Sequence, residues 1–165
     1  MRAEIEEFMK EEDYSYENLK NFTYIDNVEK ETTRFYGPGN LNFLRVALKD
    51  HYVKEVLIRK GTLITNPMMG VHYSEKYYKN PNSFRPERWE SECDNIPTFA
   101  IGGFSAGPRT CIGKHLAKLE AKIGLIKFLR RYERIELEED EASFVLRFLY
   151  QPKSLNATLF KQKLD

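Results

Sequence analysis

A glycine-rich loop that carries a cysteine and runs directly into a helix constrains this chain more than any other feature. The segment reads FSAGPRTCIGKHLAKLEAKIG from Phe104 to Gly124. Cys111 stands just before the helical part, where free backbone N–H groups and the positive end of the helix dipole stabilise a negative charge. These conditions favour the thiolate, which is the form of cysteine that binds metals. We therefore expect the fold to present this sulfur to a ligand at a helix N-terminus.

The residues around Cys111 indicate which kind of ligand could approach it. Gly107 and Gly113 carry no side chains, so a flat ligand could come close to the backbone. Arg109 offers a positive, planar fork that suits a carboxylate. A planar metal complex with carboxylate arms meets these demands, and haem is the common example.

Other interpretations of the loop are weaker. An isolated cysteine at such a position is often an inert buried thiol. Gly102 and Gly107 have the spacing of a phosphate-binding loop, but Pro108 and Arg109 follow where lysine and serine or threonine are needed. The loop therefore does not read as a nucleotide site.

A zinc site is the remaining alternative for the metal-ligating residues. Cys93, Cys111, His72 and His115 could supply four ligands, but their spacing matches no paired zinc motif. We expect His51, His72 and His115 to be ordinary polar or surface residues.

Four sequence elements occur in the order that is found in one known family. They are Glu31-x-x-Arg34, the segment Phe84-Arg85-Pro86-Glu87-Arg88-Trp89, the cysteine motif Phe104-x-x-Gly107-x-Arg109-x-Cys111-x-Gly113, and Leu116-Ala117 with Glu120-Ala121. Together they resemble the cytochrome P450 superfamily of haem-thiolate monooxygenases. The family usually has phenylalanine where this chain has Trp89.

The resemblance implies a haem b cofactor with Cys111 as the axial iron ligand. It implies that Arg109 and Arg45 hold the propionates and that Phe104 packs beside the sulfur. Gly107 and Gly113 would leave room for the ring.

The resemblance also implies a structural triad of Glu31, Arg34 and Arg88, which would attach the loop before the cysteine to a helix. Glu31 and Arg34 are three positions apart, so they share one face of a helix. Two guanidinium groups around one carboxylate can form a buried, hydrogen-bonded network.

The function implied for the family is the insertion of one oxygen atom from dioxygen into a small organic substrate, with electrons from a redox partner such as a reductase. That partner could dock near Lys114, Lys118 and Lys122, although a solvated face is the plainer interpretation of this stripe. A net charge of +1 gives no indication of nucleic-acid binding.

The chain departs from the family in one important respect. The resemblance covers only about the last third of a family member, and the oxygen-binding helix, with its acidic residue followed by threonine, is not found. We therefore expect an incomplete domain with no catalytic residue of its own, inactive in isolation. The alternative is a non-catalytic haem-binding remnant or an interaction fragment.

Membrane association is expected only for the full-length parent. No apolar stretch approaches the roughly 20 residues that span a bilayer, so the chain as given is expected to be soluble. The parent could be anchored to the endoplasmic reticulum.

The predicted fold is mainly α with short antiparallel β hairpins, corresponding to the C-terminal third of the cytochrome P450 fold. The predicted parts of this single domain are helices over 1–36, a small sheet over 37–79, a meander and cysteine loop over 80–111, a long helix over 112–132 and terminal strands over 133–165.

Periodicity and turn residues give finer expectations within these parts. Helices are predicted over 2–10 and 17–35, with Gly37-Pro38-Gly39 ending the second. Strands over 52–58 and 62–66 should form a hairpin around Arg59-Lys60-Gly61. The wide apolar stripe of helix 112–132 predicts that it is largely buried. Two terminal strands should join at Gln151-Pro152-Lys153-Ser154.

Overall fold

The computed structural model describes residues 1–37, 44–138, 143–146 and 150–162. Its α-helices are α1 (Arg2–Phe8), α2 (Tyr16–Leu19), α3 (Thr23–Tyr36), α4 (Met68–His72), α5 (Arg88–Ser91), α6 (Thr98–Ile101) and α7 (Lys114–Arg131), with 3-10 turns η1 (Cys93–Asn95) and η2 (Gly107–Arg109). Its strands are β1 (Arg45–Val46), β2 (His51–Val53), β3 (Val56–Ile58), β4 (Leu63–Ile64), β5 (Tyr132–Leu137), β6 (Ser143–Leu146), β7 (Tyr150–Ser154) and β8 (Ala157–Lys161). The predicted fold class, mainly helical with small antiparallel sheets, is confirmed.

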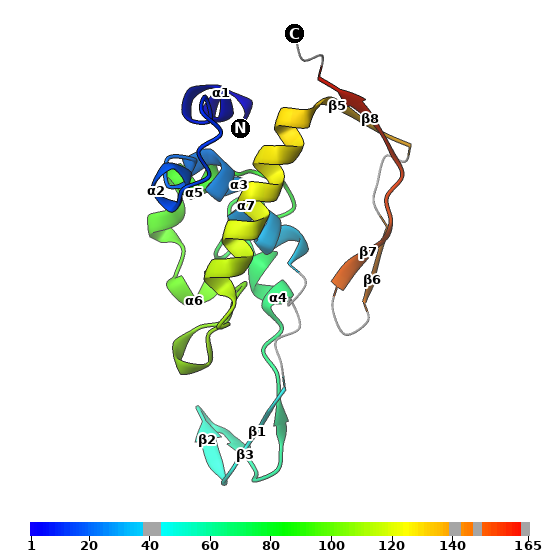
Figure 1. Cartoon of the computed structure of the whole chain (residues 1–165). Helices are drawn as coiled ribbons and strands as arrows, with labels where there is room; N and C mark the ends of the chain where they lie inside the picture. Colours follow the sequence, from blue (N-terminus) through cyan, green and yellow to red (C-terminus); the bar gives the residue numbers. More distant parts are fainter. Residues whose placement is uncertain (38–43, 139–142, 147–149, 163–165) are drawn as a thin grey trace.

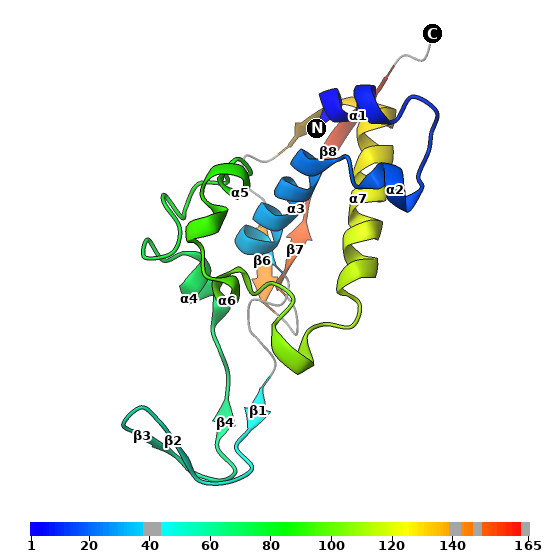
Figure 2. The ribbon, with the colours of Figure 1, turned by 90° about the vertical axis from the view of Figure 1, so that its left-hand side faces the viewer.

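The helices form the body of the molecule, with α3 beside the long helix α7 (Figure 2). The four strands β1 to β4 form an arm that projects from one end of this body, and the C-terminal strands form a separate ribbon (Figure 1). Each strand pairs with one partner in an antiparallel two-stranded sheet: β1 with β4, β2 with β3, β5 with β8, and β6 with β7.

Two apolar clusters hold the helical body together. The first joins α1, α2, α3 and α7 and consists of Ile5, Met9, Leu19, Phe22, Ile25 and Ile126. The second involves α5 and α6 and consists of Tyr78, Trp89, Ile96 and Ala100.

The predicted helix over 2–10 corresponds to α1, but the predicted helix over 17–35 is wrong because the chain breaks between α2 and α3. Phe22 occupies the break and is fully buried. The new helix start is capped by the carboxylate of Glu4, which accepts from the backbone N–H groups of Tyr24 (2.7 Å) and Ile25 (3.1 Å). A cap from about 20 residues away leaves no local sequence signal. The helix does end at Tyr36, but Pro38 and Gly39 lie outside the described residues.

Both β-hairpin expectations are wrong in their pairing. The predicted strand over 52–58 is itself a hairpin, β2–β3, which turns at Lys54 with φ of 53°. Strand β4 pairs with β1, with Arg45 opposite Ile64. The predicted terminal turn over 151–154 lies inside β7. Short apolar runs show strand character but do not identify a partner strand.

The expectation that the long helix is largely buried is also wrong. The helix is confirmed as α7, but Ile126 is its only fully buried residue. Ile112, just before it, is fully exposed and Leu116 is 60% exposed. Within the described chain, α1, α2 and α3 cover one side of α7, so part of its apolar stripe faces solvent.

Candidate functional site

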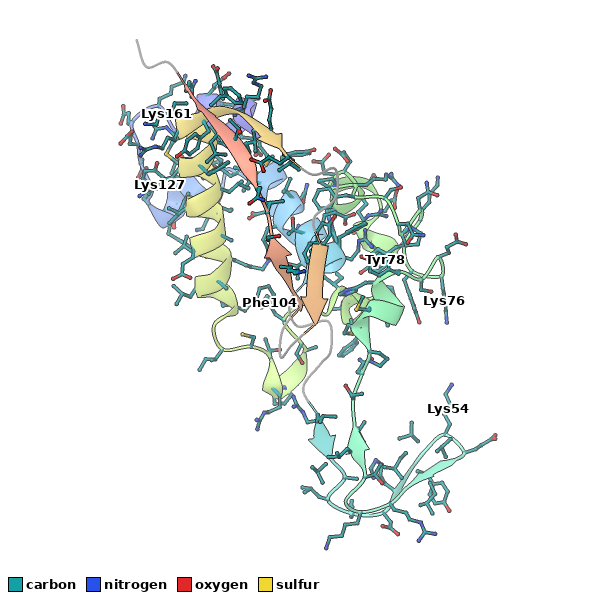
Figure 3. All side chains as sticks on the ribbon, turned by 90° about the vertical axis from the view of Figure 1, so that its right-hand side faces the viewer. Lys54, Lys76, Tyr78, Phe104, Lys127 and Lys161 are labelled. Carbon is teal, nitrogen blue, oxygen red and sulfur yellow. The ribbon has the colours of Figure 1, made fainter. Side chains whose placement is uncertain are left out.

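The cysteine loop connects α6 to α7 and is closed by backbone hydrogen bonds. The N–H of Cys111 donates to the carbonyl of Phe104 (3.0 Å), and the N–H of Thr110 donates to that of Gly107 (3.0 Å). Gly107 has φ of 73°, in the left-handed region that favours glycine. These contacts bring Phe104 next to the cysteine at the beginning of α7 (Figure 3).

The sulfur of Cys111 is exposed and is not part of a disulfide. Gly113 is the N-cap of α7, and a Cβ on it would lie 3.9 Å from Sγ. A Cβ on Gly107 would meet no atom within 4 Å. Gly113 therefore leaves the space beside the sulfur free of a side chain, and Gly107 leaves the loop open at its own position. An exposed thiol donor with open backbone beside it fits an axial ligand of a planar group.

The two arginines predicted to hold carboxylates lie on different elements. Arg109 is exposed at the end of η2, while Arg45 is exposed on β1 of the arm. Arg109 has no ion-pair partner among the residues that the structure describes. The two predicted carboxylate partners therefore come from the cysteine loop and from the arm.

Glu31, Arg34 and Arg88 meet in the interior, and all three are almost inaccessible to solvent. Glu31 accepts from Nε (3.0 Å) and Nη2 (2.8 Å) of Arg34 and from Nε of Arg88 (3.1 Å). The backbone N–H of Arg85 adds a further bond of 2.8 Å. The carboxylate of Glu31 thus binds one guanidinium group from its own helix and a second from Arg88, 57 positions further along the chain.

The two arginines also bind backbone carbonyls of the meander before α5. Arg34 donates to His72 (2.8 Å) and Pro81 (2.9 Å). Arg88 donates to Lys79 (2.8 Å) and Ser83 (3.1 Å). The network therefore attaches this irregular segment to α3, which a hydrophobic contact alone could not do with the same directionality.

The charge state of Glu31 follows from competing effects. Burial alone would raise the pKa of Glu31, but hydrogen bonds from Arg34 and Arg85 and the positive charges of Arg34 and Arg88 outweigh it. The pKa of Glu31 is therefore lowered, and the carboxylate stays ionised at neutral pH.

The basic stripe on α7 is mostly occupied by intramolecular ion pairs. Lys118 binds Glu29 (2.7 Å), and Lys122 binds Asp26 (2.6 Å) as well as the carbonyl of Leu19 (2.8 Å). Both acidic residues belong to α3. The two lysines therefore fasten α7 to α3, and of the stripe only Lys114 lacks an acidic partner among the described residues.

Two glycines before the cysteine loop pack directly against neighbouring helices. A Cβ on Gly102 would overlap with the side chain of Met68, and a Cβ on Gly103 would overlap with the Cγ2 methyl of Thr33 on α3. No local sequence pattern indicates this close packing of Gly103. The close approach places the beginning of the loop against the same helix that carries Glu31.

We expect Gly103→Ala to destabilise the fold by about 1–3 kcal/mol, because the β-branched Thr33 cannot move aside without shifting α3. Urea unfolding measures this effect. Gly124→Ala on α7 is the matched control, because a Cβ there meets nothing within 4 Å. The control should be neutral or stabilising by up to about 1 kcal/mol. Equal stability of the two variants would contradict the close packing of Gly103.

His72 is fully buried, so it is not a surface residue. Neither ring nitrogen has a hydrogen-bond partner among the residues that the structure describes, and the ring meets that of Tyr78 edge-to-face at 6.3 Å. The pKa of His72 is lowered, first by burial and second by the charge of Arg34. The side chain is therefore neutral in the folded chain at neutral pH.

This shift predicts a pH-dependent stability. The folded chain binds the His72 proton more weakly than the unfolded chain, whose histidine has a pKa of about 6.5. The contribution of His72 to the free energy of unfolding is fully present above about pH 6.5. It is lost as the pH falls from there through the lowered pKa of His72 in the folded chain. We expect His72→Phe to flatten the fall in unfolding free energy between about pH 7.5 and 5, measured by urea unfolding. An unchanged slope would show that other groups cause the acid sensitivity.

Comparison with known proteins identifies the family. The family model described as Cytochrome P450 matches residues 1–159. The chain belongs to the cytochrome P450 family. It is 36% identical over 143 residues to cytochrome P450 6A1 of Musca domestica. The matched segment covers 80% of this chain and 28% of that protein. It is 33% identical over 118 residues to cytochrome P450 3A5 of Homo sapiens, covering 72% of this chain and 23% of that protein.

Solved cytochrome P450 structures share the fold of this chain. The haem domain of cytochrome P450DA superposes with a TM-score of 0.87 at 22% identity, covering 98% of this chain and 36% of that one. A cyanobacterial CYP120A1 with retinoic acid bound superposes with a TM-score of 0.88 at 25% identity. This match covers 98% of this chain and 38% of that one. The chain thus spans little more than a third of the cytochrome P450 structures that it matches. No helix among the described residues is both long and apolar enough to cross a membrane.

Proposed function

We propose that this chain carries the thiolate side of the haem site in a cytochrome P450 monooxygenase. The observation that supports this most is the exposed, unpaired thiol of Cys111 at the start of α7, in a loop closed onto Phe104 and lined by Gly107 and Gly113. The parent enzyme would oxidise a small organic substrate with dioxygen and electrons from a partner protein. Family membership supports the reaction class, and the substrate stays open.

The residues of this chain would hold and orient haem b. Cys111 would be the axial ligand, and its sulfur would donate electron density that favours O–O cleavage when haem is bound. Arg109 and Arg45 would bind the two carboxylate arms, one from the loop and one from the arm of β strands. Phe104 would shield the sulfur from water.

The Glu31 network would serve this site without contacting the cofactor. By attaching the meander to α3, it holds the segment that leads through α6 into the cysteine loop. Its proposed role is structural. No residue of the chain is proposed as catalytic in oxygen activation.

A redox partner would approach the cysteine side of the haem, near Lys114. Because Lys118 and Lys122 are paired with α3, the docking surface would rely on Lys114. An acidic partner surface would complement this cation. Anchoring of the parent to the endoplasmic reticulum is a further part of this proposal.

A non-catalytic haem-binding or interaction fragment is the second candidate. It is favoured by the apolar side chains that the described chain leaves in solvent, such as Ile112 and, on the arm, Leu48 at 85% exposure. Surfaces of this kind mark interaction sites or aggregation-prone regions.

One reconstitution experiment tests the haem site and the expected inactivity of the isolated chain. The 165-residue chain is mixed with haem, reduced, and supplied with a reductase and a broad substrate panel. We expect haem binding with a thiolate-type spectrum in carbon monoxide but no coupled product above that of free haem. Failure to bind haem would overturn the proposed haem site and leave only the interaction fragment. Coupled product formation would overturn the expected inactivity of the isolated chain.

A further inference from the structure

Trp89 differs from the phenylalanine that the motif usually has at its position. It lies on α5, is 5% exposed and is the only tryptophan in the chain. Both phenylalanine and tryptophan fill apolar space, but only the indole carries an N–H donor. The structure shows where this additional donor points.

The indole N–H donates to Oε2 of Glu31 at 3.0 Å. The same oxygen accepts from Nε of Arg34, also at 3.0 Å. The other oxygen, Oε1, already accepts from both arginines and from the N–H of Arg85. Since Glu31 is fully buried, a phenylalanine at position 89 would leave Oε2 with one protein donor instead of two.

The ring of Trp89 faces the second apolar cluster. Its centroid lies 6.3 Å from that of Tyr78 at an angle of 65°, and the cluster includes Ala100 of α6. The hydroxyl of Tyr78 donates to the carbonyl of Ala100 at 2.9 Å. Trp89 thus touches both the ionic network and the cluster that supports α6, as does Tyr78, whose ring lies under the guanidinium groups of Arg34 and Arg88.

The support of α6 continues to the cysteine. The residues after α6, Gly102 and Gly103, pack tightly on Met68 and Thr33. Phe104 follows, and its carbonyl accepts from the N–H of Cys111. Figure 3 labels Tyr78, which belongs to the cluster that includes Ala100 of α6, and Phe104, which begins the cysteine loop.

We propose that Trp89 is a positioning residue for Cys111, acting through its N–H bond to Glu31 and its ring contact with the cluster under α6. The inference rests on the proposed role of Cys111 as the haem ligand. The N–H orients the carboxylate toward both arginines. The ring packs on the cluster that includes Ala100, and so holds α6 and the beginning of the cysteine loop in place relative to Glu31. The tryptophan therefore adds a hydrogen bond that the usual phenylalanine lacks.

The hydrogen bond itself can be tested without haem. With one tryptophan, a chain labelled with ¹⁵N-tryptophan gives a single indole N–H resonance. Glu31→Gln should shift this resonance, because it replaces the charged acceptor. Glu90→Gln is the matched control, because Glu90 lies on α5 and binds Asn27 of α3 at 3.1 Å but does not contact the indole. Equal responses to the two substitutions would overturn the bond.

The positioning role is tested with an isosteric replacement that should fold. Benzothienylalanine at position 89 keeps the bicyclic shape and has sulfur in place of the N–H. We expect it to increase the rate of haem loss about tenfold and to lower the thiolate-ligated fraction of the ferrous carbon monoxide complex, as Trp89→Phe should. A benzothienyl variant that matches the tryptophan chain would overturn the role of the N–H.

A control variant separates positioning from general loss of stability. Tyr24→Phe removes a 2.7 Å hydrogen bond from Tyr24 of α3 to Glu87, beside α5, but leaves Glu31 untouched. We expect it to leave the thiolate-ligated fraction unchanged, and an equal loss in this variant would overturn the specific role of Trp89. If the unmodified chain gives no thiolate signal, the proposed haem function fails, while the indole resonance still decides whether the Glu31 bond exists.

Discussion

Replacing Cys111 with serine is expected to abolish the red-shifted Soret band that a thiolate ligand gives the reduced haem–carbon monoxide complex. A serine hydroxyl stays protonated near neutral pH and cannot supply the electron density of a thiolate. The loop should keep its shape, since its closing bonds come from the backbone N–H groups of Cys111 and Thr110. The absorption spectrum of the reconstituted, reduced chain in carbon monoxide is the measurement.

Cys93→Ser is the matched control, because Cys93 is the only other cysteine in the chain. We expect its spectrum to equal that of the unmodified chain. A red-shifted band that survives in Cys111→Ser, or that disappears in Cys93→Ser, would refute Cys111 as the ligand.

Replacing Arg34 with alanine is expected to cost about 3–5 kcal/mol of folding free energy, because it leaves the buried charge of Glu31 partly uncompensated. The change also deprives the carbonyls of His72 and Pro81 of their donor. Such a loss is a large fraction of the stability of a typical domain, about 5–15 kcal/mol. We therefore expect Arg34→Ala to lower haem content or to prevent folding, although Arg34 is not proposed to touch haem. Urea unfolding and haem content measure the two effects.

Lys20→Ala is the control for this prediction. Lys20 pairs with Glu17 on the surface at 2.9 Å, with both side chains more than half exposed. Such a pair contributes at most about 1 kcal/mol, because solvent screens it and the side chains lose entropy. If Arg34→Ala destabilised the chain no more than Lys20→Ala, the Glu31 network would not be holding the meander.

The sequence predicted the parts of the site that depend on neighbouring residues. The i, i+3 spacing of Glu31 and Arg34 places them on one helical face, and the structure joins them on α3. The glycine-rich segment predicted a loop that leads into a long helix, and α7 begins two residues beyond the predicted position of 112. The family assignment rested on motifs of the same local kind, and the comparisons confirm it.

Strand pairing and helix continuity were predicted less well. The break at Phe22 depends on Glu4, a cap that is distant in sequence. The pairing of β4 with β1 depends on the β2–β3 hairpin folding on itself between them. The helix break and the strand pairing depend on which elements meet in space. Local periodicity does not carry that information.

By itself, then, the sequence determined the family, the first helix, and the cysteine loop with the long helix after it, because these are encoded by residue types at short spacings. Only the tertiary structure decided how the charged and polar groups are used. It paired Lys118 and Lys122 with α3, buried His72, and gave Glu31 a further donor in Trp89. The partners of Lys118 and Trp89 lie 89 and 58 positions away along the chain. The free energy of such contacts depends on burial and on distance in space, which residue spacing does not specify.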